Sequence, residues 1–456
     1  MLKKGEISMT NEHTDLAVIN RAKEDNVKLV QLQFTDINGN IKAVTIPIER
    51  FPESIEKGIW FDGSSIEGFT RICESDMYLK PDTSTYALLP WETEEITARL
   101  FCDVYMPDGS PFEGDPRYIL KRAIKNAREM NFEYNVGPEL EFFLFKPKSD
   151  GQVEPIPHDV GSYFDFSPRD LAGNVRRDII FALEKMGLNV EMSHHEVAPG
   201  QHEIDFKYAE ALKTAENALT FKQVVKSIAH QYDLHATFMP KPIFGVCGSG
   251  MHCHQSFFDI KTRKNIFFDE KDEYKLSKVA KQFIAGQLQH VRAMSAILSP
   301  TVNSYKRLVP GYEAPVYICW GQKNRSALIR IPRFSKGREQ ATRAELRCPD
   351  PSNNPYLAFA VMLEAGLDGI KRGIALPNPV EENVYEFNKD ELAYRNIATL
   401  PGSLGEAIEE LKKNKLMEAA LGSHTYQVYI HAKMAEWDEY RIQVTEWEHK
   451  KYFETA

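Results

Sequence analysis

Two glutamates, Glu139 and Glu141, stand two residues apart in the apolar segment 137–145, GPELEFFLF. The surrounding leucines and phenylalanines predict a buried strand, in which side chains two residues apart point to the same face. Two carboxylates on one face of a buried strand repel each other and lose hydration unless a cation lies between them. The pair therefore indicates either a metal site or a strand whose polar face meets solvent.

Three further strand-like segments place charged or imidazole side chains at alternate positions or within an apolar run. The side chains concerned are His252 and His254, Glu345 and Arg347, and Arg330. A single histidine is more often a core or surface residue than a ligand. Several strands that present such side chains on one face of a twisted sheet would instead line a polar funnel.

The segment 194–206, HHEVAPGQHEIDF, contributes two more acids, Glu196 and Glu203. A Pro-Gly turn separates them, so both carboxylates could converge on one ion; a surface loop is the other interpretation. Together with the residues above, the candidate ligand set is rich in carboxylates, has few histidines and shows no thiolate pattern. Such a set favours Mg²⁺ or Mn²⁺ over Zn²⁺.

Arginines that could hold anions follow within one stretch of the chain. They are Arg307, Arg325, Arg330, Arg343 and Arg347. Arginine grips carboxylate and phosphate with two hydrogen bonds, and arginines with metal-bound carboxylates provide positioning and charge neutralisation in phosphoryl transfer. The chain has no Walker A motif and no kinase glycine loop, and FGVCGSGM matches neither. The combined pattern predicts an enzyme that uses ATP and divalent metal.

The bulk composition is that of a globular protein with more than one domain. The chain has 456 residues, of which 43% are hydrophobic and 27% charged. Its formal net charge of −9 argues against nucleic acid and anionic membranes as partners. No apolar run approaches the roughly 18 residues of a membrane span, and the N-terminal segment lacks the apolar core of a signal peptide. The six cysteines form no CxxC pair, so we expect reduced thiols in a cytoplasmic protein.

The elements that must position these residues divide the chain in two. Residues 28–48 alternate like paired strands around the dipeptide Asn38-Gly39, a hairpin signal, and begin a small β-rich domain. The proline- and glycine-rich stretch 107–116 marks its end, because Asp115 and Pro116 then predict the start of a helix.

Strands and helices alternate through the rest of the chain, which predicts one large catalytic domain of the α/β or α+β class. The predicted strands cover 140–145, 203–206, 251–258, 316–320, 326–331 and 343–347. The predicted helices cover 13–30, 170–186, 211–231, 275–297, 354–372, 404–420 and 425–440.

Read together, the motifs of this sequence resemble those of class I glutamine synthetases, of the shorter branch that is not adenylylated. They occur in that family's order and spacing over most of the chain. They are FDGSSI (61–66), GPELEFFLF (137–145), HHEVAPGQHE (194–203), FMPKP (238–242), GSGMHCHQS (248–256), LVPGYEAP (308–315), NRSALIRIP (324–332) and RAELRCPDPSNNPY (343–356).

The resemblance implies that L-glutamate, ATP and ammonia are converted to glutamine, ADP and phosphate through γ-glutamyl phosphate, for ammonium assimilation. It implies an α+β fold, with an N-terminal β-grasp domain over 1–112 and a catalytic domain over 113–456 whose curved antiparallel sheet is flanked by helices. It also implies a homo-dodecamer of two stacked hexameric rings, with active sites between neighbouring subunits.

By matched position, the resemblance implies two or more metal ions, Mg²⁺ or Mn²⁺, in each active site. The ligands of the tighter metal would be Glu141, Glu196 and Glu203. The ligands of the second metal, beside the nucleotide phosphates, would be Glu139, His252 and Glu345. Three carboxylates make the more anionic site, and the second ion can be shared with ATP.

Other matched positions would hold the substrates. Glutamate would be bound by Arg307, Arg347 and the backbone of Gly248. ATP would be bound by His254, Ser256, Arg325, Arg330 and Arg343, of which Arg325 would also act in catalysis.

A third set of matched positions would handle ammonium and water. Asp62, supplied by the neighbouring subunit, and Ser65 would form the ammonium pocket, where Asp62 takes a proton. Glu313, in the flap PGYEAP, would close the site and exclude water, which otherwise hydrolyses the acyl phosphate. On their own, DGSS is an ordinary turn sequence and Glu313 an exposed loop carboxylate.

The sequence departs from the family pattern in places that bear on substrate binding and regulation. Cys247 stands where the family usually has Asn, so the amide's hydrogen bonds beside Gly248 are lost. The segment 383–387, NVYEF, lacks the adenylylation motif of the enterobacterial branch. Arg71 matches an arginine linked to glutamine feedback, which suggests regulation by glutamine, by effectors such as 2-oxoglutarate, or by nitrogen-regulatory proteins.

Three alternative functions remain open at this stage. A relative could ligate glutamate to a polyamine or another amine, although Asp62, Ser65 and Glu313 favour a compact cation. A nitrogen sensor with little catalysis would not need the complete set of metal and arginine positions. A phosphagen-type kinase would leave the ammonium motif unexplained.

Overall fold

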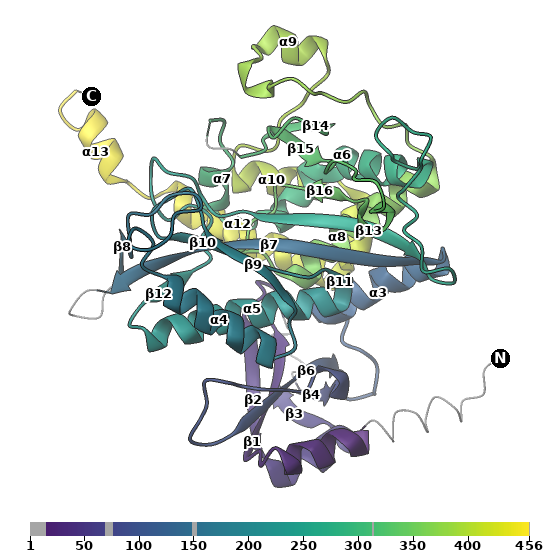
Figure 1. Cartoon of the computed structure of the whole chain (residues 1–456), viewed down its shortest axis with the longest axis vertical. Coiled ribbons are helices and arrows are strands. Elements are labelled where there is room, and N and C mark those ends of the chain that lie inside the picture. The colour runs from purple at the N-terminus through teal and green to yellow at the C-terminus, as the bar shows by residue number, and fades with distance from the viewer. Residues whose placement is uncertain (1–14, 69–75, 148–152, 312–313, 456) are drawn as a thin grey trace.

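The computed structural model describes residues 15–68, 76–147, 153–311 and 314–455. Figure 1 shows a small N-terminal unit below a larger unit that contains a long sheet and most of the helices. The predicted positions Arg71 and Glu313 lie outside the described residues. Among those described, no helix combines the length and hydropathy needed to cross a membrane.

The N-terminal unit is a strongly twisted sheet with helices against it. Within the described residues a helix covers 15–24 and precedes the strands; it ends before residue 30, where the prediction placed its end. The further elements are β1 (Leu29–Thr35), β2 (Ile41–Pro47), η1 (Ile48–Arg50), α2 (Phe51–Lys57), β3 (Ile59–Asp62), β4 (Asp76–Pro81), η2 (Thr83–Thr85), β5 (Ala87–Leu88) and β6 (Thr97–Tyr105). The strand order is β2-β1-β6-β4-β3, with β5 beside β6. The predicted hairpin is confirmed, since β1 and β2 pair antiparallel and Gly39 has a φ of 81° in the connection.

The larger unit is built on a ten-stranded sheet with the path β14-β15-β16-β13-β7-β10-β9. Its strands are β7 (Phe132–Pro147), β8 (Val153–Pro157), β9 (Val190–His195), β10 (Gln201–Phe206), β11 (Ala209–Glu210), β12 (His235–Thr237), β13 (Met251–Asp259), β14 (Tyr317–Gly321), β15 (Ala327–Arg330) and β16 (Ala344–Leu346). Its pairs are antiparallel apart from β14 and β15, which run parallel. The α+β class and the mostly antiparallel catalytic sheet are therefore confirmed.

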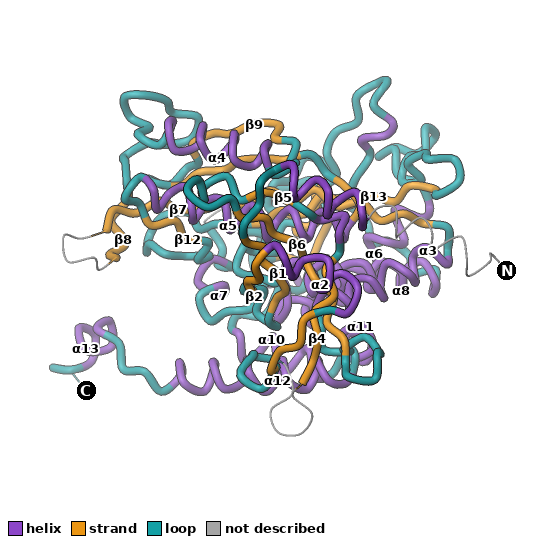
Figure 2. The backbone as a smooth tube through the Cα atoms, turned by 90° about the horizontal axis from the view of Figure 1, so that it is seen from below, coloured by secondary structure: helices purple, strands orange, loops and turns teal. Residues whose placement is uncertain are grey.

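The larger unit also contains helices that pack beside the sheet or project from it. They are α3 (Pro116–Glu129), α4 (Gly173–Lys185), α5 (Ala211–Gln231), α6 (Lys278–Leu298), α7 (Ser304–Arg307), α8 (Pro355–Arg372), α9 (Lys389–Tyr394), α10 (Leu404–Lys412), α11 (Lys415–Leu421), α12 (Ser423–Arg441) and α13 (Glu446–Tyr452), with the short η3 (Glu339–Ala341) and η4 (Val384–Glu386). In Figures 1 and 2, α13 projects from the body at the end of α12.

Local signals explain where several helices begin. Asp115 accepts a hydrogen bond from the Arg117 amide and Pro116 opens α3, as predicted. The predicted helix 404–420 is wrong as a single element. Asn414 accepts hydrogen bonds from the amides of Leu416 and Met417, so a new helix starts there and α10 and α11 are separate.

Strand β7 carries the organising pattern of the catalytic unit. Its residues Leu140, Phe142 and Leu144 are fully buried in the main hydrophobic core, against helices such as α3 and α5. The alternate side chains of Glu139 and Glu141 point to the other face and line a cavity. One strand thus anchors the core and presents two carboxylates, as its alternation predicts.

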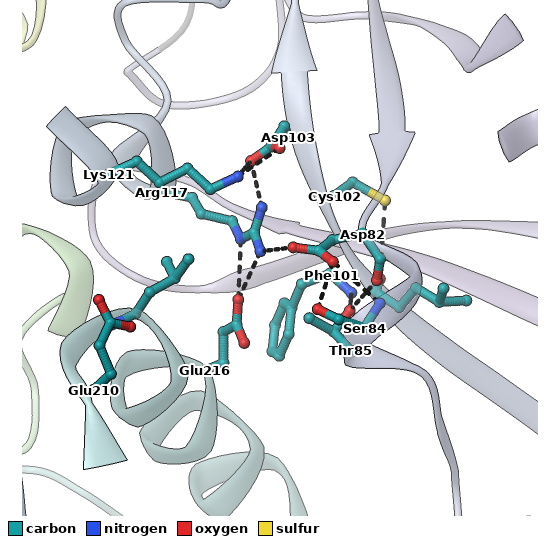
Figure 3. Close-up of polar contacts among 12 residues, drawn as sticks. Asp82, Ser84, Thr85, Phe101, Cys102, Asp103, Arg117, Lys121, Glu210 and Glu216 are labelled. Atoms are coloured by element: carbon teal, nitrogen blue, oxygen red, sulfur yellow. Dashed lines mark hydrogen bonds and ion pairs between the residues drawn. The ribbon is translucent and has the colours of Figure 1, made fainter. Parts of the chain in front are cut away.

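A buried arginine joins the two units. Arg117, 2% exposed, bonds to Asp82 and Asp103 of the N-terminal unit and to Glu216 of α5, as Figure 3 shows. The Arg117 Nη2 atom lies 2.5 Å from Asp82 and 2.8 Å from Glu216. Lys121 adds a second cation 2.7 Å from Asp103. Three carboxylates from both units therefore share one guanidinium, which fixes how the units meet.

We predict that Arg117→Ala lowers the free energy of unfolding by about 3–5 kcal/mol, because it leaves buried carboxylates without their cation. Urea denaturation followed by fluorescence measures this change. The matched control is Arg292→Ala, which removes the pairs of Arg292 with Glu406 and Glu410; the exposed fractions of these side chains are 31%, 45% and 26%. That variant should lose about 1 kcal/mol or less. Equal, small losses in both variants would contradict the assignment of Arg117 as the clamp.

Candidate active site

The polar face of the sheet encloses a cavity of about 750 Å³. Residues from β7, β9, β10, β13, β15 and β16 line it, together with loops around residues 163, 325 and 383. The sequence-predicted residues that line it are Glu139, Glu141, Glu196, Glu203, His252, Arg325, Arg330, Glu345 and Arg347. All six predicted metal ligands therefore face one space.

One cluster in this cavity consists of Glu139, His252 and Glu345, whose ligand atoms lie within 4.8 Å of one another. The His252 Nδ1 atom is 3.4 Å from Glu139 and 3.6 Å from Glu345. His252 stands opposite Glu139 in the register of β13 and β7, which explains their proximity. These are the three residues matched to the second metal.

A second cluster consists of His194, Glu196 and Glu203, also within 4.8 Å of one another. The turn between β9 and β10 folds back as its Pro-Gly sequence suggests, and His194 pairs with Glu203 in register. His194 Nδ1 lies 3.4 Å from Glu196. His194 was not among the predicted ligands, although its place two residues before Glu196 is the same alternation that marked the other strands.

Glu141 lies behind this second cluster. It stands opposite Glu203 in the register of β7 and β10. Its Oε2 atom accepts hydrogen bonds from Gln201 Nε2 at 2.9 Å and from the Gly250 amide at 3.0 Å. Burial, and next the nearby Glu196 carboxylate, raise the pKa of Glu141 to about 8. A divalent cation would relieve this repulsion and hold the carboxylate ionised.

Gln201 is a functional candidate that the sequence analysis missed. Its Nε2 atom also donates to the Gly248 carbonyl at 3.1 Å, so it joins the metal-facing turn to the loop matched to glutamate binding. Gln201 is 1% exposed. The only feature of the sequence that could have identified Gln201 is its place in the motif HHEVAPGQHE, because a glutamine is uncharged and adds nothing to a charge pattern.

The predicted anion-binding arginines differ in their position and in their bonding partners. Arg347 is 7% exposed, and among the described residues its Nε and Nη1 atoms make no hydrogen bond. Its Nε forms an ion pair with Glu345 at 3.4 Å, and the donor left at Nη1 is suited to an anionic ligand. Arg330 binds Glu345 at 2.5 Å, while Arg325 lines the cavity from a loop. Arg307 does not line it and donates to backbone carbonyls of residues 347–349.

Three residues that were matched to nucleotide-contacting positions do not line the cavity. They are His254, Arg343 and Ser256. Arg343 Nε donates to His254 Nδ1 at 3.1 Å, so that nitrogen carries no proton. The proton is therefore on Nε2, which donates to Glu139 at 2.7 Å. His254 thus supports a predicted metal ligand from the side.

The predicted ammonium residues lie apart from the cavity. Asp62 ends β3 in the N-terminal unit, and Asp62 and Ser65 are exposed and do not line the cavity. Gly248 lies where an added Cβ would be 2.2 Å from the Pro240 carbonyl, so its loop passes too closely for a side chain. Cys247 packs, partly buried, against the small apolar cluster that includes Phe143.

The fold and the site together define a class of enzyme. A sheet whose polar face carries two carboxylate–histidine clusters fits Mg²⁺ or Mn²⁺ better than Zn²⁺, since thiolates do not take part. The buried Arg347, whose Nη1 makes no hydrogen bond within the described residues, adds a place for a carboxylate or phosphate. This combination is that of metal-dependent enzymes that transfer a phosphoryl group between anionic substrates.

Comparison with known proteins identifies the family. Residues 26–107 match the glutamine synthetase β-grasp domain, and residues 113–452 match the glutamine synthetase catalytic domain. The chain therefore belongs to the glutamine synthetase family of ligases, which in general depend on ATP and divalent metal. The boundary between 112 and 113 stays a prediction, although it falls between the two matched ranges.

Individual relatives agree with this family. A glutamine synthetase of Clostridium saccharobutylicum is 53% identical over 97% of this chain and 99% of its own length. One of Methanosarcina mazei is 54% identical over 95% and 96%. Among solved structures, a GmaS/ADP complex superposes with a TM-score of 0.87 at 31% identity, covering 96% of this chain and 99% of its own. Plasmodium falciparum glutamine synthetase superposes with a TM-score of 0.86 at 27% identity, covering 96% and 98%.

We predict that Mn²⁺ binding at pH 7 releases protons and that affinity rises with pH. A Glu141 carboxyl with a pKa of about 8 is largely protonated at that pH in the metal-free chain. It must lose its proton before it can bind a metal ion, so raising the pH removes a proton that competes with the metal. Isothermal titration calorimetry in buffers of different ionisation enthalpy counts the protons released. Affinity independent of pH, without proton release, would show that Glu141 is already ionised.

Proposed function

We propose that the chain catalyses ATP-dependent ligation of ammonia to the γ-carboxylate of L-glutamate in the cavity lined by β7, β10, β13 and β16. The observation that carries this proposal is that two acidic clusters, on either side of β7, share one cavity with the buried Arg347 guanidinium, whose Nη1 makes no hydrogen bond within the described residues. A carboxylate does not react with ammonia, because it lacks a leaving group. ATP therefore first phosphorylates the γ-carboxylate, ammonia then attacks the acyl carbon, and phosphate leaves.

The metal assignment follows the two clusters. Glu196 and Glu203, backed by Glu141 and joined by His194, would hold the tighter ion. Glu139, His252 and Glu345 would hold the second ion, beside the phosphates. When bound, the ions supply charge neutralisation for the phosphoryl group and the acyl oxygen. We assign Mg²⁺ or Mn²⁺, two or more per site.

The substrate anions would be held by cationic and backbone donors around the clusters. Arg347 would offer its Nη1 donor to a carboxylate of glutamate, while its Nε lies 3.4 Å from Glu345. Arg307 shapes that pocket by holding the backbone carbonyls of residues 347–349, and Gly248 would offer its backbone. Arg325 and Arg330 face the cavity and would contact phosphates.

The nucleotide would extend beyond this cavity toward three further predicted residues: His254, Ser256 and Arg343. Because His254 already donates to Glu139 and accepts from Arg343, its role would be to align the second metal's ligand while nucleotide lies next to it. Arg343 keeps donors available after its bond from Nε. Both residues would therefore couple ATP to the second metal.

The ammonium pocket would be completed by another copy of the chain. Asp62 and Ser65 lie in the N-terminal unit and outside the cavity of the same chain, which is consistent with donation to a neighbour. There Asp62 would favour ammonium by charge and take its proton. Glu313 would close the site against water.

This arrangement requires an oligomer, and we propose a homo-dodecamer of two hexameric rings acting in the cytoplasm in ammonium assimilation. We further propose that glutamine feedback acts through Arg71. Small effectors or nitrogen-regulatory proteins would be its other regulators.

Product analysis tests the amine substrate directly. We expect purified protein with L-glutamate, ATP and Mg²⁺ to release phosphate and form glutamine with ammonium, and to give little product with a panel of polyamines or methylamine. Mass spectrometry identifies the product, and omission of glutamate is the control. Phosphate release with another amine but not with ammonium would overturn the proposal.

Substitution of Asp62 tests the ammonium pocket. We expect Asp62→Ala to lower kcat/KM for ammonium by about 10²–10⁴-fold, because the group that deprotonates ammonium is gone. ATP binding should stay near that of the unmodified chain. The matched control is Asp76→Ala, because Asp76 stands opposite Asp62 in the register of β3 and β4 and is also exposed. Equal loss of ammonium turnover and ATP binding would contradict the role of Asp62.

A further inference from the structure

A fully buried polar cluster lies beneath the metal-facing turn, on the opposite face of its two strands. In the register of β9 and β10, His194 pairs with Glu203 and the next residues, His195 and His202, pair with each other. Alternation places the first pair toward the cavity and the second pair away from it. Both His195 and His202 have no exposed surface. The cluster is therefore separated from the proposed ions by only the thickness of the sheet.

Asp159 is the centre of this buried cluster. It lies in the loop that follows β8, and its side chain has no exposed surface. Its Oδ1 atom accepts from His195 Nε2 at 2.9 Å and from the Gly200 amide at 2.9 Å. It also accepts from the Gly161 amide at 3.3 Å, and Oδ2 accepts from the Leu171 amide at 3.2 Å. One carboxylate thus holds a side chain and three backbone amides.

These bonds converge on the turn that carries Glu196 and Glu203. Gly200 has a φ of 69°, and an added Cβ would be 2.9 Å from the Leu144 carbonyl, so the turn is tight at this point. His195 Nδ1 donates to the Glu196 carbonyl at 2.6 Å. Asp159 therefore fixes the backbone directly before Glu196, through His195, and again near the end of the turn, through Gly200.

A second arm fixes the strand that carries Glu203. Arg176 of α4 contacts His202 Nδ1 at 2.9 Å and binds Asp170 through two contacts of 3.1 and 2.5 Å. His202 directly precedes Glu203 in β10. The two ends of the metal-facing turn are thus each tied to a buried ion pair.

We propose that Asp159 is a positioning residue for the tighter metal site: through His195 and the Gly200 amide it sets the distance between the Glu196 and Glu203 carboxylates. The inference rests on the proposed metal role of those two glutamates. Partners that orient metal ligands without touching the ion commonly change affinity by about tenfold to a hundredfold. Asp159 would act in this way on the backbone of the turn as well as on a side chain.

The buried cluster is better suited to positioning than to holding an ion of its own, although Asp159, His195 and His202 could in principle converge on one. Both nitrogens of His195 face oxygen acceptors and so both carry protons, which leaves no lone pair for a metal. The Arg176 guanidinium lies 2.9 Å from His202 and would repel a cation.

Mn²⁺ binding to the full-length protein tests the role of Asp159. Asp159→Ala removes both carboxylate oxygens, so the bonds that His195 Nε2 and the Gly200 amide donate to Oδ1 are lost. We expect the tighter Mn²⁺ dissociation constant, measured from the free-Mn²⁺ electron paramagnetic resonance signal, to rise by roughly tenfold to a hundredfold. The weaker site, at Glu139, should keep its affinity.

The matched control is Asp368→Ala, which alters an aspartate–histidine pair elsewhere in the catalytic unit, with His290 Nε2 2.9 Å from Asp368 and 18% of the Asp368 side chain exposed. It should lower the melting temperature without changing either Mn²⁺ constant. His195→Gln, which keeps a donor toward Asp159 but loses the bond to Glu196, provides a second variant if Asp159→Ala does not fold; it should also weaken only the tighter site.

Unchanged tight binding in a folded Asp159 or His195 variant would overturn the proposal, as would equal weakening of both sites. The unmodified chain and Glu203→Gln separate this outcome from failure of the proposed metal role. If the unmodified chain binds no Mn²⁺, or Glu203→Gln binds it equally well, the metal assignment itself is wrong.

Discussion

Mutual repulsion among carboxylates on one face of a buried sheet is the constraint on which the rest of this molecule depends. Glu139, Glu141, Glu196, Glu203 and Glu345 face one cavity, and burial together with neighbouring charge already lifts the pKa of Glu141 to about 8. Burying several ionised carboxylates together destabilises the folded chain unless cations neutralise them. The scaffold must therefore hold the carboxylates at fixed distances from one another. Binding of divalent ions would stabilise this arrangement most.

Strands β7, β9 and β10 meet this requirement because one face of each is anchored in the interior while the other face presents the carboxylates. The even-numbered residues of β7 from Leu140 to Leu144 anchor the core, while its odd-numbered glutamates face the cavity. Strands β9 and β10 repeat the arrangement with polar anchors, because Asp159 and Arg176 hold their hidden face. At the other end of the catalytic unit, Arg117 locks the N-terminal unit in place. In the proposed ring this lock would also set where Asp62 is presented to a neighbour.

Much of this could be predicted from sequence because it depends on short-range periodicity. Alternation identified the strands around Glu139 and His252, and helix 211–231 was predicted with the bounds that α5 has. Features that depend on long-range contact were not accessible. The break at Asn414 needs a capping bond, and His194 gains meaning only from its register with Glu203. Asp159 lies 36 residues before its partner His195, and nothing near it in the sequence marks it as structural.

In the proposed active site, one sheet face would hold two ions at fixed positions, with β7 between them. Anomalous scattering from crystals of the full chain grown with Mn²⁺ and a non-hydrolysable ATP analogue tests it most directly. The account predicts two peaks, one at Glu196 and Glu203 with Glu141, and one at Glu139, His252 and Glu345. A single shared ion, or a peak at Asp159, His195 and His202 instead, would contradict it.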